Sequence, residues 1–118
     1  MRPKTIFCDI DGTLVEHVSP DIACKPDHKM ILLDGTIEKF LEWDRKGYNI
    51  ILTTGRKESL RKETTRQLSE AGIIYDQLVM GIGGGYRVLI NDRKPDRLGD
   101  TAMAINLTRN KGIGGVNI

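Results

Sequence analysis

The sequence predicts a single α/β domain, a Rossmann-like fold with three layers around a parallel sheet. Short β-rich runs alternate with amphipathic stretches, polar residues follow the strand runs, and 118 residues suffice for one domain only. Parallel neighbours need long crossover connections, which the helical stretches supply. Helices are therefore expected on both faces of the sheet.

The first element is a β-rich run over residues 5–10, which stops at Asp11 and Gly12. An Asp-Gly pair after such a run is typical of a turn. Asp9 and Asp11 are therefore expected where a buried strand ends. Residues 16–31, which follow, are polar and contain two prolines.

Two amphipathic helices are expected, and each is ended by a glycine. The first begins at about Thr36 and stops at Gly47, because apolar residues recur at helical spacing and basic residues precede the glycine. The second covers about residues 58–70 and stops at Gly72. Its apolar edge is narrow, so it is expected on the surface.

Four further strands are expected, over residues 48–53, 73–80, 87–92 and 101–107. The first of these four ends in a Thr-Gly-Arg sequence, and the strand over 87–92 ends in Asn-Asp. A loop with four glycines lies before that strand. The order of elements repeats strand and helix, as a parallel sheet requires.

Polar residues at three strand ends form the predicted site, because the carboxyl ends of parallel strands meet in one crevice. They are Asp9, Asp11, Thr54, Gly55, Asn91 and Asp92. Repulsion among clustered carboxylates is relieved by a hard divalent cation, and oxygen ligands with retained waters suit Mg²⁺. Amides beside the two glycine turns can donate to anionic oxygens. Together these groups indicate a phosphoryl substrate.

Three motifs, in this order, resemble those of the haloacid dehalogenase superfamily. Asp-Ile-Asp-Gly-Thr at residues 9–13 resembles its first motif, Thr-Gly-Arg at 54–56 its second, and residues 91–96 its fourth. The resemblance covers about residues 5–107. It implies that residues 1–118 form a single catalytic domain, a Mg²⁺-dependent phosphatase that hydrolyses a phosphomonoester through an aspartyl-phosphate.

The resemblance assigns the acids of the site. Asp9 matches the nucleophile and Asp11 the general acid/base, and both match metal ligands. Asp92 matches the direct metal ligand. Asp96 is either a further site acid or a solvated loop residue.

The resemblance also assigns the phosphate-binding groups. Thr54 matches the catalytic phosphate-binding hydroxyl, and Gly12 and Gly55 lie where backbone amides approach the phosphate. Arg56 either orients the substrate phosphate or caps the following helix.

The lysine of the superfamily's third motif is missing, since no lysine lies between Gln77 and Asp92. Arg87 is the only cation just before the strand over 87–92, and it is either the replacement catalytic cation or a surface arginine beside a strand. Lys62 is a further candidate. The absence puts the turnover rate in doubt.

The spacing of the motifs leaves no room for a cap domain. Only 42 residues separate Asp11 from Thr54, and 37 separate Thr54 from Asp92. The resemblance therefore implies a capless member with an open cleft. A small sugar phosphate ranks first as substrate and a nucleotide second, and a catalytically degenerate phosphate- or metal-binding protein is the alternative. A second copy is expected to cover the cleft through a flap over residues 16–30 and the glycine loop over 81–85.

Composition excludes several classes of protein. The net charge is +2 without a basic stripe, so no nucleic-acid partner is expected, and there is no run of eighteen apolar residues for a membrane span. Cys8 and Cys24 have no CxxC spacing and are expected as thiols of a cytoplasmic protein. A response-regulator receiver domain is also excluded, because its phosphorylated aspartate follows a later strand and is preceded by an acid pair near the N-terminus. The expected partner is a small phosphorylated metabolite.

Overall fold

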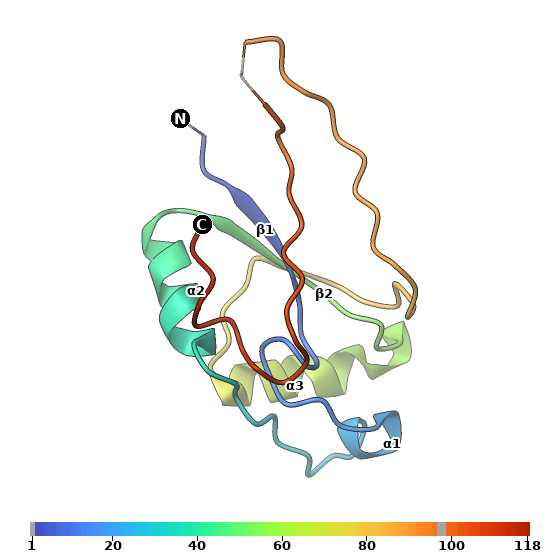
Figure 1. The fold of residues 1–118 in the computed structure, drawn as a ribbon. Coiled ribbons are helices and arrows are strands. Elements are labelled where there is room, and N and C mark those ends of the chain that lie inside the picture. The colour runs from blue at the N-terminus through green and yellow to red at the C-terminus, as the bar shows by residue number, and fades with distance from the viewer. Residues whose placement is uncertain (1, 97–98) are drawn as a thin grey trace.

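The computed structural model describes residues 2–96 and 99–118. The regular elements are shown in Figure 1: β1 (Thr5–Asp9), α1 (Pro20–Ala23), α2 (Thr36–Arg45), β2 (Asn49–Thr53), the 3₁₀ helix η1 (Glu58–Leu60), α3 (Arg61–Ala71) and β3 (Gln77–Val79). The strands form one sheet in the order β1-β2-β3, and both neighbouring pairs are parallel. The α/β fold class with a parallel sheet is confirmed.

The core lies on one face of this sheet. Alternate residues of β1 and β2 point into it, following the two-residue period of a strand. Phe40 and Trp43 of α2 and Leu68 of α3 join the same cluster, and the rings of Phe40 and Trp43 lie 5.4 Å apart. Ile113, near the C-terminus, is also buried there. This packing fixes the strand ends that carry the predicted site.

The two expected helices are confirmed, with glycines at their ends. Gly47 and Gly72 have φ values of 75° and 78°, which residues with a Cβ rarely adopt. The second predicted helix is divided into η1 and α3. A short helix that was not expected, α1, lies in the flap and begins at Pro20, whose fixed φ suits a first helical position.

The opposite face of the sheet is open at β1. Phe7 is 58% exposed on it, although its neighbours along the strand are buried. Within the described residues, β1 forms a ladder with β2 on one side and with no strand on the other. β1 is therefore the edge strand of the described sheet, and its carboxyl end carries Asp9 of the predicted site.

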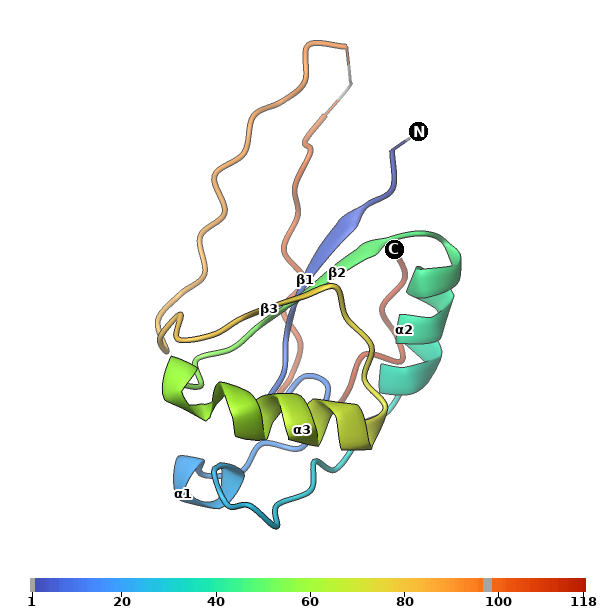
Figure 2. The ribbon, with the colours of Figure 1, turned by 180° about the vertical axis from the view of Figure 1, so that it is seen from behind.

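The strands predicted over residues 87–92 and 101–107 are wrong for the part of the chain that is described. Both segments belong to a long excursion, residues 83–96 and 99–107, which we call the arm (Figures 1 and 2). In the described residues of the arm, no main-chain group bonds to another main-chain group, so the β-rich sequence has no strand to pair with.

The arm gives the molecule its length. The longest dimension is 50 Å and the radius of gyration is 14.9 Å, against about 13 Å for a compact domain of this size. In both views the tip of the arm lies beyond the chain's first residues, at the amino ends of the strands. No helix among the described residues has the length and apolar character to cross a membrane.

Candidate active site

The turn after β1 places the first acid of the site. Asp9 is the last residue of β1, and the Thr13 hydroxyl donates a hydrogen bond of 3.2 Å to its Oδ2. The chain around this carboxyl raises its pKa by desolvation, even though the residue is exposed, while hydrogen bonds from Ile10 and Thr13 act in the opposite direction. Neighbouring Asp11 raises the pKa further. Asp9 therefore offers a carboxylate with reduced hydration at the edge of the sheet.

Asp11 is held by a two-pronged ion pair with Arg56, which follows β2. The guanidinium donates to Oδ2 over 2.9 Å and to Oδ1 over 2.8 Å. The two side chains are 21% and 7% exposed, so water screens this pair less than a surface pair. The fork fixes the plane of the Asp11 carboxylate.

Arg56 is itself fixed by α3. Its Nη1 donates to Gln67 Oε1 over 2.8 Å and to the Thr64 hydroxyl over 3.3 Å, and both residues are fully buried. Gln67 in turn donates to the Ala23 carbonyl of α1 over 2.8 Å. We call Asp11, Arg56, Thr64 and Gln67 the clamp. It connects the turn after β1, the end of β2, α3 and the flap.

The predicted phosphate-binding residues lie around the clamp. Thr54 is buried and its hydroxyl accepts a hydrogen bond of 3.0 Å from the Arg56 amide. The Gly12 amide donates to the Val15 carbonyl over 2.8 Å, so this turn satisfies its own donor. Gly55 faces the glycine loop, where a Cβ would lie 3.0 Å from the Gly83 carbonyl oxygen. In this structure the Arg56 guanidinium binds the Asp11 carboxylate. A contact between Arg56 and the substrate phosphate stays a prediction.

Arg87 lies at the root of the arm. It donates to the Gly85 carbonyl, and its charge lowers the pKa of Asp9. That effect places the guanidinium within electrostatic range of the predicted nucleophile. Lys62, the other candidate, is exposed on α3.

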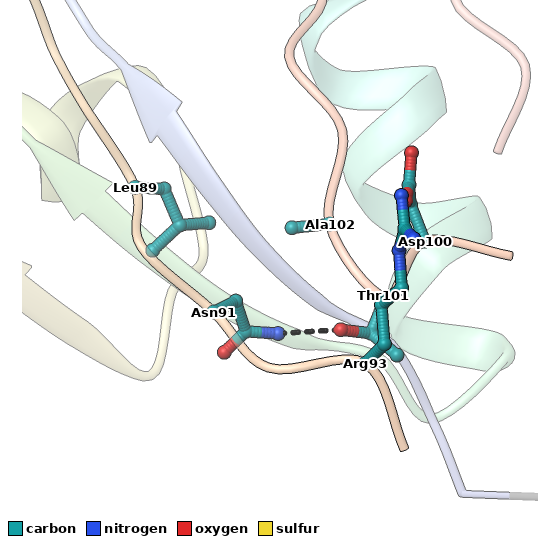
Figure 3. A pocket seen from close by; sticks show the side chains of 6 residues that line it. All are labelled: Leu89, Asn91, Arg93, Asp100, Thr101 and Ala102. Carbon is teal, nitrogen blue, oxygen red and sulfur yellow. Dashed lines mark hydrogen bonds and ion pairs between the residues drawn. The ribbon is translucent and has the colours of Figure 1, made fainter. Parts of the chain in front are cut away.

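Asp92 is the predicted site residue that the structure does not bring to the others. It lies on the arm and pairs with Lys94 over 2.9 Å, and this contact lowers its pKa. Asp96 is exposed further along the arm. The hollow drawn in Figure 3 lies between the two limbs of the arm, where Asn91 donates to the Thr101 hydroxyl, and it holds none of the clamp.

Of the three acids predicted to bind Mg²⁺, the structure brings Asp9 and Asp11 together and leaves Asp92 on the arm. In residues 2–96 and 99–118, no group of three or more Asp, Glu, His or Cys side chains is arranged so that it could hold a metal ion. Asp9 and Asp11 approach each other, but both Asp11 oxygens accept from Arg56. Asp9 and Asp11 are therefore the two carboxylates that would hold a magnesium ion here, together with water and substrate oxygens.

Sequence reasoning missed Thr13, Thr64 and Gln67. Thr64 and Gln67 lie on the face of α3 that also carries Leu68, at spacings of three and four residues. From this spacing, Thr64 and Gln67 could have been predicted to lie on the buried side of α3 beside Leu68.

The family profile of the haloacid dehalogenase-like hydrolases matches residues 6–86. The chain belongs to this family. The match includes the turn after β1, the clamp and Thr54, and it ends within the first residues of the arm. Comparison with curated protein sequences gives no match.

Solved structures support the fold of this haloacid dehalogenase-like hydrolase. A chain in the structure of the Pnkp1/Rnl/Hen1 complex is 30% identical, with a TM-score of 0.58 over 73% of this chain. A second structure of that RNA repair complex gives 31% identity and 0.57 over 72%. This chain spans only 30% and 28% of those two chains.

A structural-genomics target from Vibrio cholerae is more similar in size. It is 20% identical, with a TM-score of 0.52, and the match covers 75% of this chain and 79% of that one. At this identity the similarity shows the fold alone.

Proposed function

We propose that this hydrolase is a phosphatase that cleaves phosphomonoesters through an aspartyl-phosphate on Asp9. The observation that supports it best is the pairing of two carboxylates at the end of the same strand: Asp9, which accepts a hydrogen bond from Thr13, and Asp11, which the Arg56 fork clamps. One carboxylate is available for attack, while the other is oriented for proton transfer.

In the first half of the reaction, an Asp9 oxygen attacks phosphorus and the bond from phosphorus to the leaving oxygen breaks. Asp11, protonated, gives its proton to that oxygen, so an alcohol departs. A carboxylate has about four lone-pair positions, and Arg56 occupies two of them. Two positions therefore remain for the proton that Asp11 is proposed to transfer.

In the second half, the Asp11 carboxylate takes a proton from water, whose oxygen attacks the phosphorus of the aspartyl-phosphate. The bond between phosphorus and Asp9 breaks, inorganic phosphate leaves, and both acids return to their starting states. Thr54 and the glycine loop lie at the strand ends from which the phosphoryl oxygens would be held. Arg87 is proposed as the cation opposite Asp9.

Magnesium dependence is part of the proposal, supported by the family and by the two adjacent acids. The substrate proposed is a small sugar phosphate, with a nucleotide second, because the spans between the motifs leave the cleft without a cap. A cytoplasmic location is proposed with it, supported by the free thiols of Cys8 and Cys24.

The experiment is hydrolysis of p-nitrophenyl phosphate with and without Mg²⁺, followed by a panel of sugar phosphates and nucleotides. Wild-type protein quenched in acid should carry a phosphate label that hydroxylamine removes, and Asp9→Asn should carry none. Metal-dependent binding of phosphate without turnover of any ester would instead indicate the degenerate binding protein.

A phosphorylated RNA end is a second candidate substrate. It is favoured by the 30–31% identity to chains of the RNA repair complex. Oligonucleotides with a 5′-phosphate or a 3′-phosphate therefore belong in the panel. Preference for it over sugar phosphates would replace the first choice of substrate and leave the chemistry unchanged.

A further inference from the structure

Arg109 lies against the turn that carries Asp11 and Gly12, and the proposed reaction does not use it. If residue 12 had a Cβ, that atom would lie 3.2 Å from Arg109 Cγ and 3.7 Å from Arg109 Nε. The Arg109 side chain therefore fills the space that a side chain on residue 12 would need. It comes from the C-terminal segment, which passes beside the turn after β1 (Figures 1 and 2).

The guanidinium of Arg109 is open to solvent. The residue is exposed, and in the part of the chain that the structure describes it pairs with no carboxylate. In contrast, Arg56, Arg61 and Arg66 each form an ion pair with an acid of the chain. The N–H groups of Arg109 are therefore available to an anion that enters the site.

The residue after Arg109 fixes its position and has an unfavourable backbone conformation. Asn110 has a φ of 63°, and in residues 2–96 and 99–118 it is the one residue other than glycine with a positive φ. Such conformations persist where the surroundings impose them, and they are concentrated at functional sites. The Asn110 amide donates to the Gly12 carbonyl over 2.8 Å, and its Oδ1 accepts from the His17 amide over 2.8 Å. Asn110 thus holds Arg109 beside the turn.

The chain that follows Asn110 is anchored to the body. The Ile113 amide donates to the Asp34 carbonyl over 2.9 Å, and the Ile113 side chain is buried. A Cβ on Gly112 would clash with the same Asp34 carbonyl. Packing therefore sets the place of Arg109. The match to the family profile ends at residue 86, so it assigns no role to this segment.

The place of Arg109 indicates the leaving-group side of the substrate. Gly12 follows Asp11, the acid proposed to give its proton to the leaving oxygen. A side chain against Gly12 therefore lies beside the alcohol that departs. Of the two arginines, Arg87 is the one whose charge lowers the pKa of Asp9. Arg87 is thus suited to the reacting phosphoryl group, and Arg109 to the rest of the substrate.

We propose that Arg109 binds a second phosphate, carried by the leaving group, and so selects substrates that have one. The proposal rests on the proposed function for the reacting phosphate. A guanidinium binds a phosphate through two parallel N–H···O bonds, which an uncharged hydroxyl cannot match. A sugar bisphosphate and the end of a nucleic-acid strand both supply a second phosphate. A sugar monophosphate and a free mononucleotide do not.

The test compares substrates in matched pairs that differ in the second phosphate. Fructose 6-phosphate is paired with fructose 1,6-bisphosphate, and thymidine 5′- and 3′-monophosphate are paired with the dinucleotides pTpT and TpTp. In each pair, kcat/KM with Mg²⁺ is measured for both members and expressed as a ratio. For the wild type, at least one pair should favour the second phosphate by about tenfold, the size of one charge-assisted contact. The pair that does so identifies the source of that phosphate.

Arg109→Gln keeps the methylene groups that lie on Gly12 and removes the charge, so it should abolish most of this ratio. Arg109→Lys keeps the charge without the fork and should retain part of it. Lys111→Gln removes an exposed charge from the same segment and is the matched control, which should keep the wild-type ratio. An equal loss in Lys111→Gln would show a general effect of positive charge and would overturn the proposal.

Asn110→Ala tests whether the backbone conformation positions Arg109. Alanine rarely adopts a positive φ, so this variant should lower the same ratio although both neighbouring charges remain. Asn110→Gly tolerates that φ and should lower the ratio less. A general loss of stability would affect both members of a pair and cancel in the ratio. An unchanged ratio in Asn110→Ala would contradict the positioning by this residue.

Calorimetry separates the second-phosphate site from the proposed function. Asp9→Asn protein with Mg²⁺ should bind the preferred bisphosphate or dinucleotide about tenfold more tightly than its monophosphate. Addition of Arg109→Gln to this variant should remove the difference. That result would support the site even if the wild type cleaves no ester, in which case only the proposed function fails. If no pair differs in affinity or in rate, the role of Arg109 is overturned, whether or not monophosphates are hydrolysed.

Discussion

The clamp and the arm differ in where their partners come from. In the clamp, Arg56, Thr64 and Gln67 are buried and bonded to groups of the same chain. In the described residues of the arm, apolar side chains are exposed, and no main-chain group bonds to another main-chain group. The comparison teaches that buried partners fix the side chains that orient Asp11, whereas Asp92 lies on an exposed segment and pairs with Lys94.

Asp9→Asn is expected to have the largest effect, because it removes the nucleophile and leaves the clamp and the arm unchanged. Turnover should fall by about a thousandfold or more, measured with saturating p-nitrophenyl phosphate. Asp44→Asn, an exposed acid of α2, is the matched control and should be fully active. Wild-type turnover in Asp9→Asn would contradict the assignment.

The same variant should not lose stability. Desolvation raises the pKa of Asp9, so its ionised form opposes folding at neutral pH. The folded state gains stability as the pH falls through that pKa, and the neutral Asn does not depend on it. The melting temperature of Asp9→Asn at pH 7 should therefore equal or exceed that of the wild type, and the difference should shrink in acid.

Arg87→Ala tests the root of the arm. If the guanidinium supplies the missing cation, its loss should lower turnover by about a hundredfold with little change in melting temperature. Lys62→Ala, which removes an exposed cation from α3, is the control and should be neutral. The reverse result would move the catalytic cation to α3.

Arg56→Lys tests the clamp by keeping the charge and removing the fork. A lysine cannot bind both Asp11 oxygens and Gln67 together, so turnover should fall by about tenfold and stability by about 2 kcal/mol. Arg61→Lys, at the exposed pair of Arg61 with Glu58, should cost far less. Equal effects in urea unfolding would show that the clamp is no stronger than a surface pair.

Thr13→Ala should have the smallest effect. It removes a hydrogen bond that lowers the pKa of Asp9, so that pKa should rise and the acid limb of kcat/KM should move to higher pH. On that limb the rate should fall by about two- to threefold, the size of one weak hydrogen bond. Thr13→Ser keeps the hydroxyl and should restore the profile, which a purely structural effect would not require.

The strands and helices outside the arm could largely be predicted from the sequence. The two-residue period of β1 and β2 and the glycines after α2 and α3 are local signals, and the structure follows them. The same signals placed Asp9, Asp11 and Thr54 at neighbouring strand ends. Family membership followed from these residues.

The arm and the clamp could not be predicted in this way. Residues 87–92 have the composition of a strand, but a strand also needs an edge to pair with, and composition does not say which edge is within reach. The clamp depends on Gln67, whose burial is decided by the helix face that packs and not by its own polarity. Both are properties of distant contacts.

Residues near the C-terminus bond to the turn that follows β1 and to the flap. Asn110 accepts from the His17 amide over 2.8 Å and donates to the Gly12 carbonyl, while Ile113 enters the core. His17 and Asn110 lie 93 positions apart in the sequence. Contacts of such long range form slowly, because a large loop must close before they are gained. During synthesis, the turn that carries Asp9 and Asp11 must therefore leave the ribosome long before the residues that secure it.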